Sequence, residues 1–166
     1  MEKSITFKEL SQRWLSVSSL GKTYTYQQNL QSYINHLNNG IGDCKVSDVK
    51  PAHIDEIIRQ LYIENPNTKK PTSKKVLKNI VDCATRIFDY AIENELIYKN
   101  PARNKKKVIP KNAPTKIVSA ITPEQQQFVI DTEHRAKIAA VIMMFMGLRT
   151  GEVLAIEWGD IDLVNY

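Results

Sequence analysis

The sequence predicts a mainly α-helical protein, with a four-helix bundle followed by the mostly helical start of a second domain. Two observations support this fold class. Apolar residues recur every three or four positions in four stretches of the first hundred residues, and no stretch there alternates apolar and polar residues as a strand would. Glycine, asparagine and proline separate the stretches. With 166 residues and 42% hydrophobic residues, the chain can bury a core.

The first two helices are predicted from their start and stop signals. Thr6 and Glu9 form a capping box at the start of the first, and Gly21 ends it. The second is expected to begin near Thr23 and to end at residues 38–40. Their apolar stripes are Phe7, Leu10, Trp14 and Val17, and then Tyr26, Leu30, Tyr33, Ile34 and Leu37.

The third and fourth helices follow a loop over residues 40–50. Pro51 suits a first helical turn, and residues 65–67 break the third helix. The fourth helix is the longest, from about residue 72 to about residue 94. The apolar sides carry Ile54, Ile57, Ile58 and Leu61 in the third, and Val76, Ile80, Ala84, Ile87, Phe88 and Ala91 in the fourth.

The remainder of the chain divides into a linker and a second domain. We expect residues 1–100 to be the helical bundle, residues 101–116 an extended basic linker, and residues 117–166 a truncated domain. Thr122 and Gln125 form a second capping box, with proline between them. The helix over about 136–146 is apolar nearly all round, so we expect it to be fully buried.

Positive charge is concentrated in the middle of the chain. Residues 66–116 hold 13 Lys and Arg against 4 Asp and Glu, whereas residues 1–65 are neutral and residues 117–166 are acidic. Such a local excess is typical of proteins that bind nucleic acid, although it can also be a solvated basic surface. The candidate phosphate contacts are Lys74, Lys75, Lys78, Arg86, Arg103, Lys105, Lys106 and Lys107.

Other classes of protein are disfavoured. Cys44 and Cys83 have no metal-ligand spacing, and the three histidines are scattered, so we expect neither a metal nor a disulfide framework. No apolar run reaches the length of a membrane span, and the first residues lack a signal-peptide pattern. We therefore expect a cytoplasmic protein.

A second candidate site lies near the end of the sequence. Arg149 follows an apolar stretch and precedes a short helix expected to start at Thr150. A guanidinium donates two parallel hydrogen bonds to phosphate oxygens, and Glu152, one turn away, could hold it in place. We expect Ile156 and Trp158 to lock this turn to the core. For so short a motif there is an alternative to phosphate binding: Arg149 could have a structural role only, paired with an acidic residue at the junction of two helices.

The longer pattern resembles the first arginine motif of tyrosine recombinases, the phage-integrase family. It comprises the apolar helix, Gly-x-Arg-x-Gly-Glu over 147–152, Leu154, Trp158 and Asp-Ile-Asp over 160–162. The aromatic-rich residues 7–15 and the segment 97–101 are similar to the ends of that family's SAM-like core-binding domain. The resemblance spans nearly the whole chain.

The resemblance implies a site-specific recombinase that integrates or excises DNA. In this family a tyrosine attacks a DNA phosphate and forms a 3′-phosphotyrosyl link, without a cofactor. Arg149 and Glu152 match an arginine and its supporting acid. The lysine, the His-x-x-Arg pair and the nucleophilic tyrosine have no match; Tyr166 is too close to the motif, and His134-Arg135 has the wrong spacing. We therefore expect this chain to bind double-stranded DNA but not to cut it.

Two alternatives remain open at this level. The chain could be a non-catalytic helical DNA-binding regulator, although it shows no helix-turn-helix pair with a basic second helix. It could also be a protein-interaction module whose basic surface meets an acidic partner. For the recombinase, the resemblance implies a full-length tetramer on paired DNA sites, and we expect the fragment to be monomeric away from DNA.

Overall fold

The structure is a computed structural model that describes residues 5–162. It divides into two compact units, Met1–Lys116 and Ile117–Tyr166. The described residues form helices and no strand; their one β-bridge joins Thr6 and Lys45. The mainly α-helical fold class is therefore confirmed.

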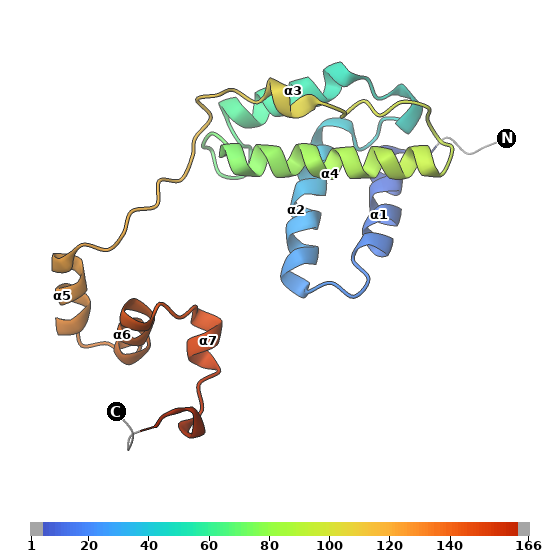
Figure 1. Cartoon of the computed structure of the whole chain (residues 1–166). Helices are drawn as coiled ribbons and strands as arrows, with labels where there is room; N and C mark the ends of the chain where they lie inside the picture. The colour runs from blue at the N-terminus through green and yellow to red at the C-terminus, as the bar shows by residue number, and fades with distance from the viewer. Residues whose placement is uncertain (1–4, 163–166) are drawn as a thin grey trace. The chain divides into compact units, whose positions relative to one another are not determined.

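The first unit is built around its longest helix (Figure 1). The helices are α1 (Phe7–Ser18), α2 (Tyr24–Ile41), α3 (Pro51–Ile63) and α4 (Lys74–Glu93), with a short 3-10 turn, η1 (Val46–Asp48). Helices α1 and α2 lie side by side on one side of α4, and α3 lies along another. Because α4 contacts all three, its residues supply the largest share of the core.

Side-chain caps fix where these helices begin. Thr6 Oγ1 accepts a hydrogen bond from Glu9 N at 3.3 Å, and Glu9 Oε2 accepts one from Thr6 N at 3.0 Å, which is the predicted capping box. Thr23 caps α2 and Ser73 caps α4 in the same manner with their hydroxyl oxygens.

Helix α2 continues to Ile41, beyond its predicted end at Gly40. A Cβ at Gly40 would lie 2.6 Å from Ile57 Cγ1, closer than side chains approach one another. The glycine therefore allows α3 to pack closely against α2 instead of ending the helix. A stop signal and a close-packing glycine cannot be distinguished in a single sequence.

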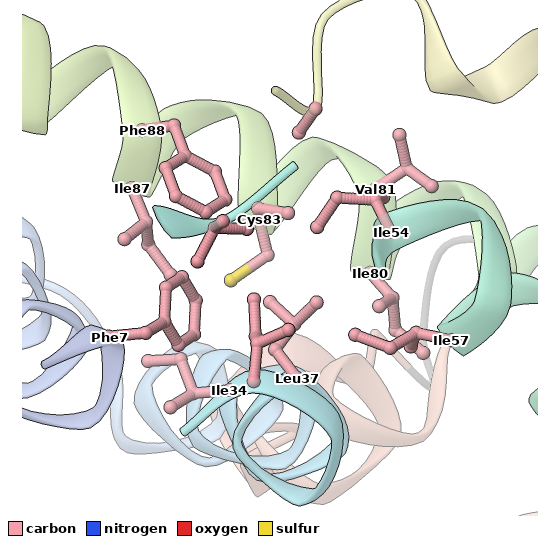
Figure 2. Packing of buried hydrophobic residues seen from close by; sticks show 14 of the residues in the cluster. Phe7, Ile34, Leu37, Ile54, Ile57, Ile80, Val81, Cys83, Ile87 and Phe88 are labelled. Carbon is pink, nitrogen blue, oxygen red and sulfur yellow. The ribbon is translucent and has the colours of Figure 1, made fainter. Parts of the chain in front are cut away.

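The core brings together residues from all four helices (Figure 2). The rings of Phe7 and Phe88 lie with their centroids 5.3 Å apart, and Ile34, Leu37 and Ile54 complete the layer between α2, α3 and α4. The predicted stripes are confirmed, except that Val17 is exposed and Tyr26, Tyr33 and Val76 are half-buried.

The segment after the bundle is not the extended linker expected over residues 101–116. It belongs to the first unit, and Ala102, Ile109 and Ala113 are buried in its core. A 3-10 turn, η2 (Lys105–Val108), lies against α3 and α4. These three small or apolar residues, spaced among lysines, help to dock this segment, which we call the strap (residues 101–114).

The strap leads to a stability prediction. A protein of residues 1–116 should melt cooperatively, whereas one of residues 1–100 should melt at a clearly lower temperature, because it loses the buried strap residues and the strap's ion pairs. Thermal melts followed by circular dichroism measure the difference. Equal midpoints would show that the strap adds no stability.

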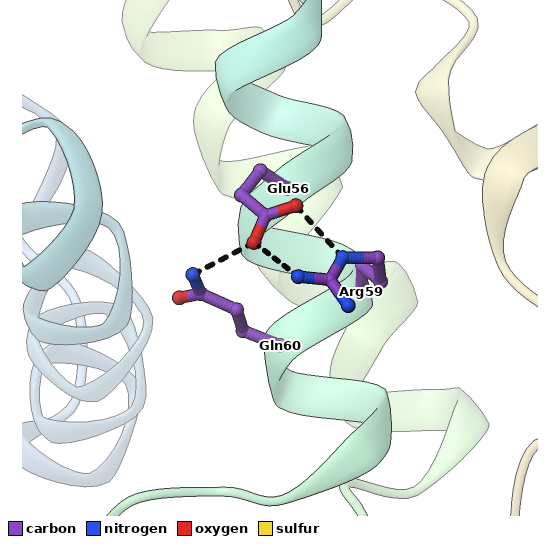
Figure 3. A network of polar contacts seen from close by, with 3 residues as sticks. All are labelled: Glu56, Arg59 and Gln60. Atoms are coloured by element: carbon purple, nitrogen blue, oxygen red, sulfur yellow. Dashed lines mark hydrogen bonds and ion pairs between the residues drawn. The ribbon is translucent and has the colours of Figure 1, made fainter.

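An exposed polar network on α3 provides a second prediction (Figure 3). Arg59 donates to both carboxylate oxygens of Glu56, at 2.8 and 2.7 Å, and Gln60 donates to one of them at 2.8 Å. The hydrogen bonds from Arg59, followed by that from Gln60, lower the pKa of Glu56 to about 2. Because the folded pKa lies below the ordinary value, this network stabilises the fold above about pH 4.5 and stops doing so as pH falls toward 2.

An NMR titration of the Glu56 side chain tests this shift. Replacing Arg59 with Ala should return the pKa of Glu56 most of the way to its ordinary value, and added salt should weaken the effect because the network faces solvent. An unchanged pKa in Arg59→Ala would show that the ion pair does not form in solution.

The second unit is a run of short helices. They are α5 (Pro123–Asp131), α6 (Lys137–Met146), α7 (Thr150–Leu154) and the 3-10 turn η3 (Trp158–Asp160). The capping box of Thr122 and Gln125 is present. The expectation that α6 is fully buried is wrong for the described residues: none of its side chains is buried, and Ile138 is 75% exposed. The described part of this unit has too little surface to enclose an apolar helix.

Candidate nucleic-acid interface

The first turns of α4 carry exposed positive charge. Ser73 caps the helix, and the first turn contains Lys74 and Lys75 but no acidic residue. Lysines at this end of a helix repel its positive dipole end, so the arrangement favours a nearby anion. Lys75 and Lys78 are exposed, whereas Lys74 Nζ donates to the backbone oxygen of Lys111 at 3.0 Å.

The strap lies beside α4 and extends this charged surface. Lys106 meets Asp82 of α4, and the Lys74 contact reaches the far end of the strap. Arg103 and Lys107 are exposed on the strap, and they form no ion pair with any residue in the range 5–162. We call the exposed residues Lys75, Lys78, Arg103 and Lys107 the basic face.

The three consecutive lysines of the strap are not equivalent. Lys105 Nζ lies 2.7 Å from Asp55 Oδ2 on α3, and the Lys105 side chain is only 17% exposed. Lys106 Nζ lies 2.6 Å from Asp82 Oδ1 on α4. These two ion pairs fasten the strap to the bundle. Lys107, the third lysine, forms no ion pair with a carboxylate of residues 5–162.

Arg86 occupies a different environment farther along α4. Its Nη1 donates to the Tyr26 hydroxyl at 3.5 Å, which joins α4 to α2. Asp89 and Glu93 line the same hollow together with Trp14, so the field around this arginine is less positive than at the start of the helix. The structure therefore separates Arg86 from the basic face.

In the second unit, Arg149 and Glu152 meet at the start of α7. Gly147 ends α6 with a left-handed φ of 68°, which lets the chain turn sharply into the arginine. Glu152 Oε2 accepts from Arg149 N at 2.7 Å, and Oε1 accepts from Arg149 Nη1 at 3.1 Å. The Arg149 side chain is 87% exposed, and of its guanidinium nitrogens only Nη1 donates to Glu152. Trp158 is 86% exposed, so the expectation that it locks this turn to the core is wrong.

Residues 5–162 contain neither a membrane-spanning helix nor a metal-binding cluster. No helix there combines the length and the apolar character that crossing a membrane requires. No group of three or more His, Cys, Asp and Glu side chains in this range is placed to hold a metal ion.

Comparison with known families decides the identity of the first unit. The profile of the phage integrase central domain matches residues 7–108, which is more than half of the chain and includes most of the strap. The chain belongs to the phage-integrase family of tyrosine recombinases.

Individual members of the family agree with this assignment. A XerC-like tyrosine recombinase of Caldanaerobacter subterraneus is 27% identical over 96% of this chain and 41% of its own length. The ICEBs1 integrase of Bacillus subtilis is 25% identical over 98% of this chain and 43% of its own. The chain thus spans about two fifths of the length of these relatives.

A solved integrase shows the same fold. The Tn1549 transposon integrase, determined in complex with circular intermediate DNA, superposes with a TM-score of 0.79. It is 21% identical, and the match covers 98% of this chain and 52% of that one. Because the two sequences are only 21% identical, this comparison shows that the chains share a fold and nothing beyond that.

The structure brings together only some of the residues that the sequence singled out in this integrase chain. Lys75 and Lys78 lie on one helix, and the strap beside it carries Arg103 and Lys107, whereas Lys105 and Lys106 are engaged in ion pairs. Arg149 and Glu152 belong to the other unit. Tyr166, whose position in the sequence argues against a role as nucleophile, lies outside the described residues.

Sequence reasoning missed one polar contact of the integrase bundle. Asn79 Nδ2 donates to the Tyr33 hydroxyl at 2.9 Å, between α4 and α2. Helical periodicity puts Asn79 on the polar side of its helix and Tyr33 in an apolar stripe, and nothing in the sequence links the two. The seven-residue spacing of Tyr26 and Tyr33 puts both hydroxyls on one edge of α2, but it does not point to Asn79 as a partner.

Proposed function

We propose that the first unit of this integrase-family chain binds double-stranded DNA through the basic face. The observation that carries the proposal is the set of exposed cations on α4 and the strap that have no carboxylate partner among residues 5–162. DNA presents a dense row of phosphates, and lysine and arginine that neutralise them release counterions. The integrase of known structure with the same fold was solved with DNA, which supports this choice of partner.

The test compares two variants with equal loss of charge. One replaces Lys75, Lys78, Arg103 and Lys107 with Ala; the control replaces Lys8, Lys22, Lys45 and Lys50, which are also exposed in the first unit. Fluorescence anisotropy with a labelled duplex should show roughly tenfold or greater weakening for the first variant and little change for the control. Equal weakening of both would mean that net charge, and not this surface, attracts DNA.

We propose a catalytic role for the second unit only within a longer protein. There Arg149 would bind the phosphate under attack and Glu152 would orient the guanidinium, which agrees with the bridging hydrogen bonds of Glu152. The nucleophilic tyrosine and the His-x-x-Arg pair would come from outside the 166 residues, so the chain alone is inactive. In this proposal the full protein cuts and rejoins DNA in the bacterial cytoplasm through a 3′-phosphotyrosyl intermediate, as a tetramer on paired sites.

A further inference from the structure

Asn79 occupies a distinctive place on the proposed DNA-binding helix. It is the one amide side chain within the basic first half of α4, with Lys75 one turn before it and Lys78 next to it. It is half-buried in the seam between α4 and α2, where its Nδ2 donates to the Tyr33 hydroxyl at 2.9 Å. The nearest acid on its face, Asp82, is paired with Lys106 and adds little repulsion toward a polyanion.

The hydrogen bond to Tyr33 uses only part of the amide. A carboxamide has two N–H donors and an oxygen acceptor in one plane, and Tyr33 takes one donor. Within the described residues 5–162 the structure gives no further hydrogen bond to the Asn79 side chain. The second N–H and the oxygen therefore remain available in the plane that Tyr33 fixes.

We infer that Asn79 reads an adenine in the major groove, with Tyr33 as its positioning residue. Adenine presents N7 as an acceptor and N6 as a donor, and asparagine can meet both at once. The free N–H would donate to N7, and the side-chain oxygen would accept from N6. The inference rests on the proposed function, since it requires α4 to face a duplex. The lysines beside Asn79 would hold the flanking phosphates and set its depth in the groove.

The experiment selects preferred sites from a pool of duplexes with a randomised central segment, using the 166-residue chain. The wild-type chain should enrich sites with an adenine at one position. Asn79→Ala should lose about 5- to 150-fold of that preference, while the other positions keep theirs. Tyr33→Phe, which removes only the hydroxyl, should weaken the same preference in part. Lys75→Ala should lower the affinity for every sequence and leave the preference unchanged.

Asn79→Asp keeps the test decisive if the alanine variant does not fold. A carboxylate can accept from the Tyr33 hydroxyl, and it should shift the preference at this position from adenine to cytosine, whose N4 is a donor. If the wild-type chain binds no duplex, the proposed function and the inference both fail. If it binds duplexes with no base preference, or with one that the Asn79 variants leave intact, the inference alone fails.

Discussion

Replacing Phe88 with Ala is expected to cost about 3–5 kcal/mol of unfolding free energy and to leave much of the bundle unfolded. The side chain is fully buried in the second half of α4, and its ring contacts that of Phe7 on α1. Its removal leaves a cavity among residues of several helices that cannot all collapse around it. Urea denaturation of the 166-residue chain, followed by circular dichroism, measures the loss.

The matched control is Phe128→Ala in the second unit, measured in the 166-residue chain beside Phe88→Ala. Phe128 is 72% exposed on α5, so the same truncation removes little packing. We expect it to leave the first unit's stability within about 0.5 kcal/mol of the original. If Phe88→Ala cost less than about 1 kcal/mol, the layer between α1 and α4 would not be packed as the structure has it.

Replacing Arg149 with Lys is the second change with a large expected effect. In a longer recombinase that contains this chain, it should slow DNA cleavage about a hundred- to a thousandfold, while duplex binding survives. Lysine keeps the charge but loses the planar fork that grips two phosphate oxygens. The readout is the rate at which the protein forms a covalent adduct with a labelled duplex.

Two comparisons separate this role from a structural one. Arg135→Lys, at another exposed arginine of the same unit, should leave the rate unchanged. Glu152→Gln should slow the reaction less than Arg149→Lys does, because one side-chain oxygen can still accept from the arginine. An Arg149→Lys protein that forms the adduct at nearly the original rate would leave Arg149 as a junction arginine paired with Glu152.

The helices of the bundle could be predicted from the sequence because their signals are local. A capping side chain and its amide, such as Thr6 and Glu9, lie three residues apart, and apolar stripes repeat within one helix. The end of α2 could not be predicted, because the role of Gly40 depends on Ile57 of another helix. The exposure of α6 could not either, since periodicity reports what a helix can bury and not what covers it.

In the candidate site, too, local features could be predicted from the sequence and features that depend on distant residues could not. The local charge excess located the basic region, but every lysine in it looked alike. Lys105 and Lys106 became distinct only because Asp55 and Asp82, far away in the sequence, lie beside them in the fold. The partnership of Asn79 with Tyr33 spans 46 residues and leaves no local pattern. Contacts between polar side chains that are far apart in the sequence therefore could not be predicted.

The salt dependence of duplex binding tests the central proposal most directly. Each phosphate neutralised contributes a slope of about −0.9 to log K plotted against log salt. The variant that lacks Lys75, Lys78, Arg103 and Lys107 should therefore have a slope shallower than the original by roughly three to four, and the control variant should keep the original slope. If the original chain binds duplex DNA with no salt dependence, or if both variants keep its slope, the basic face does not contact the phosphates.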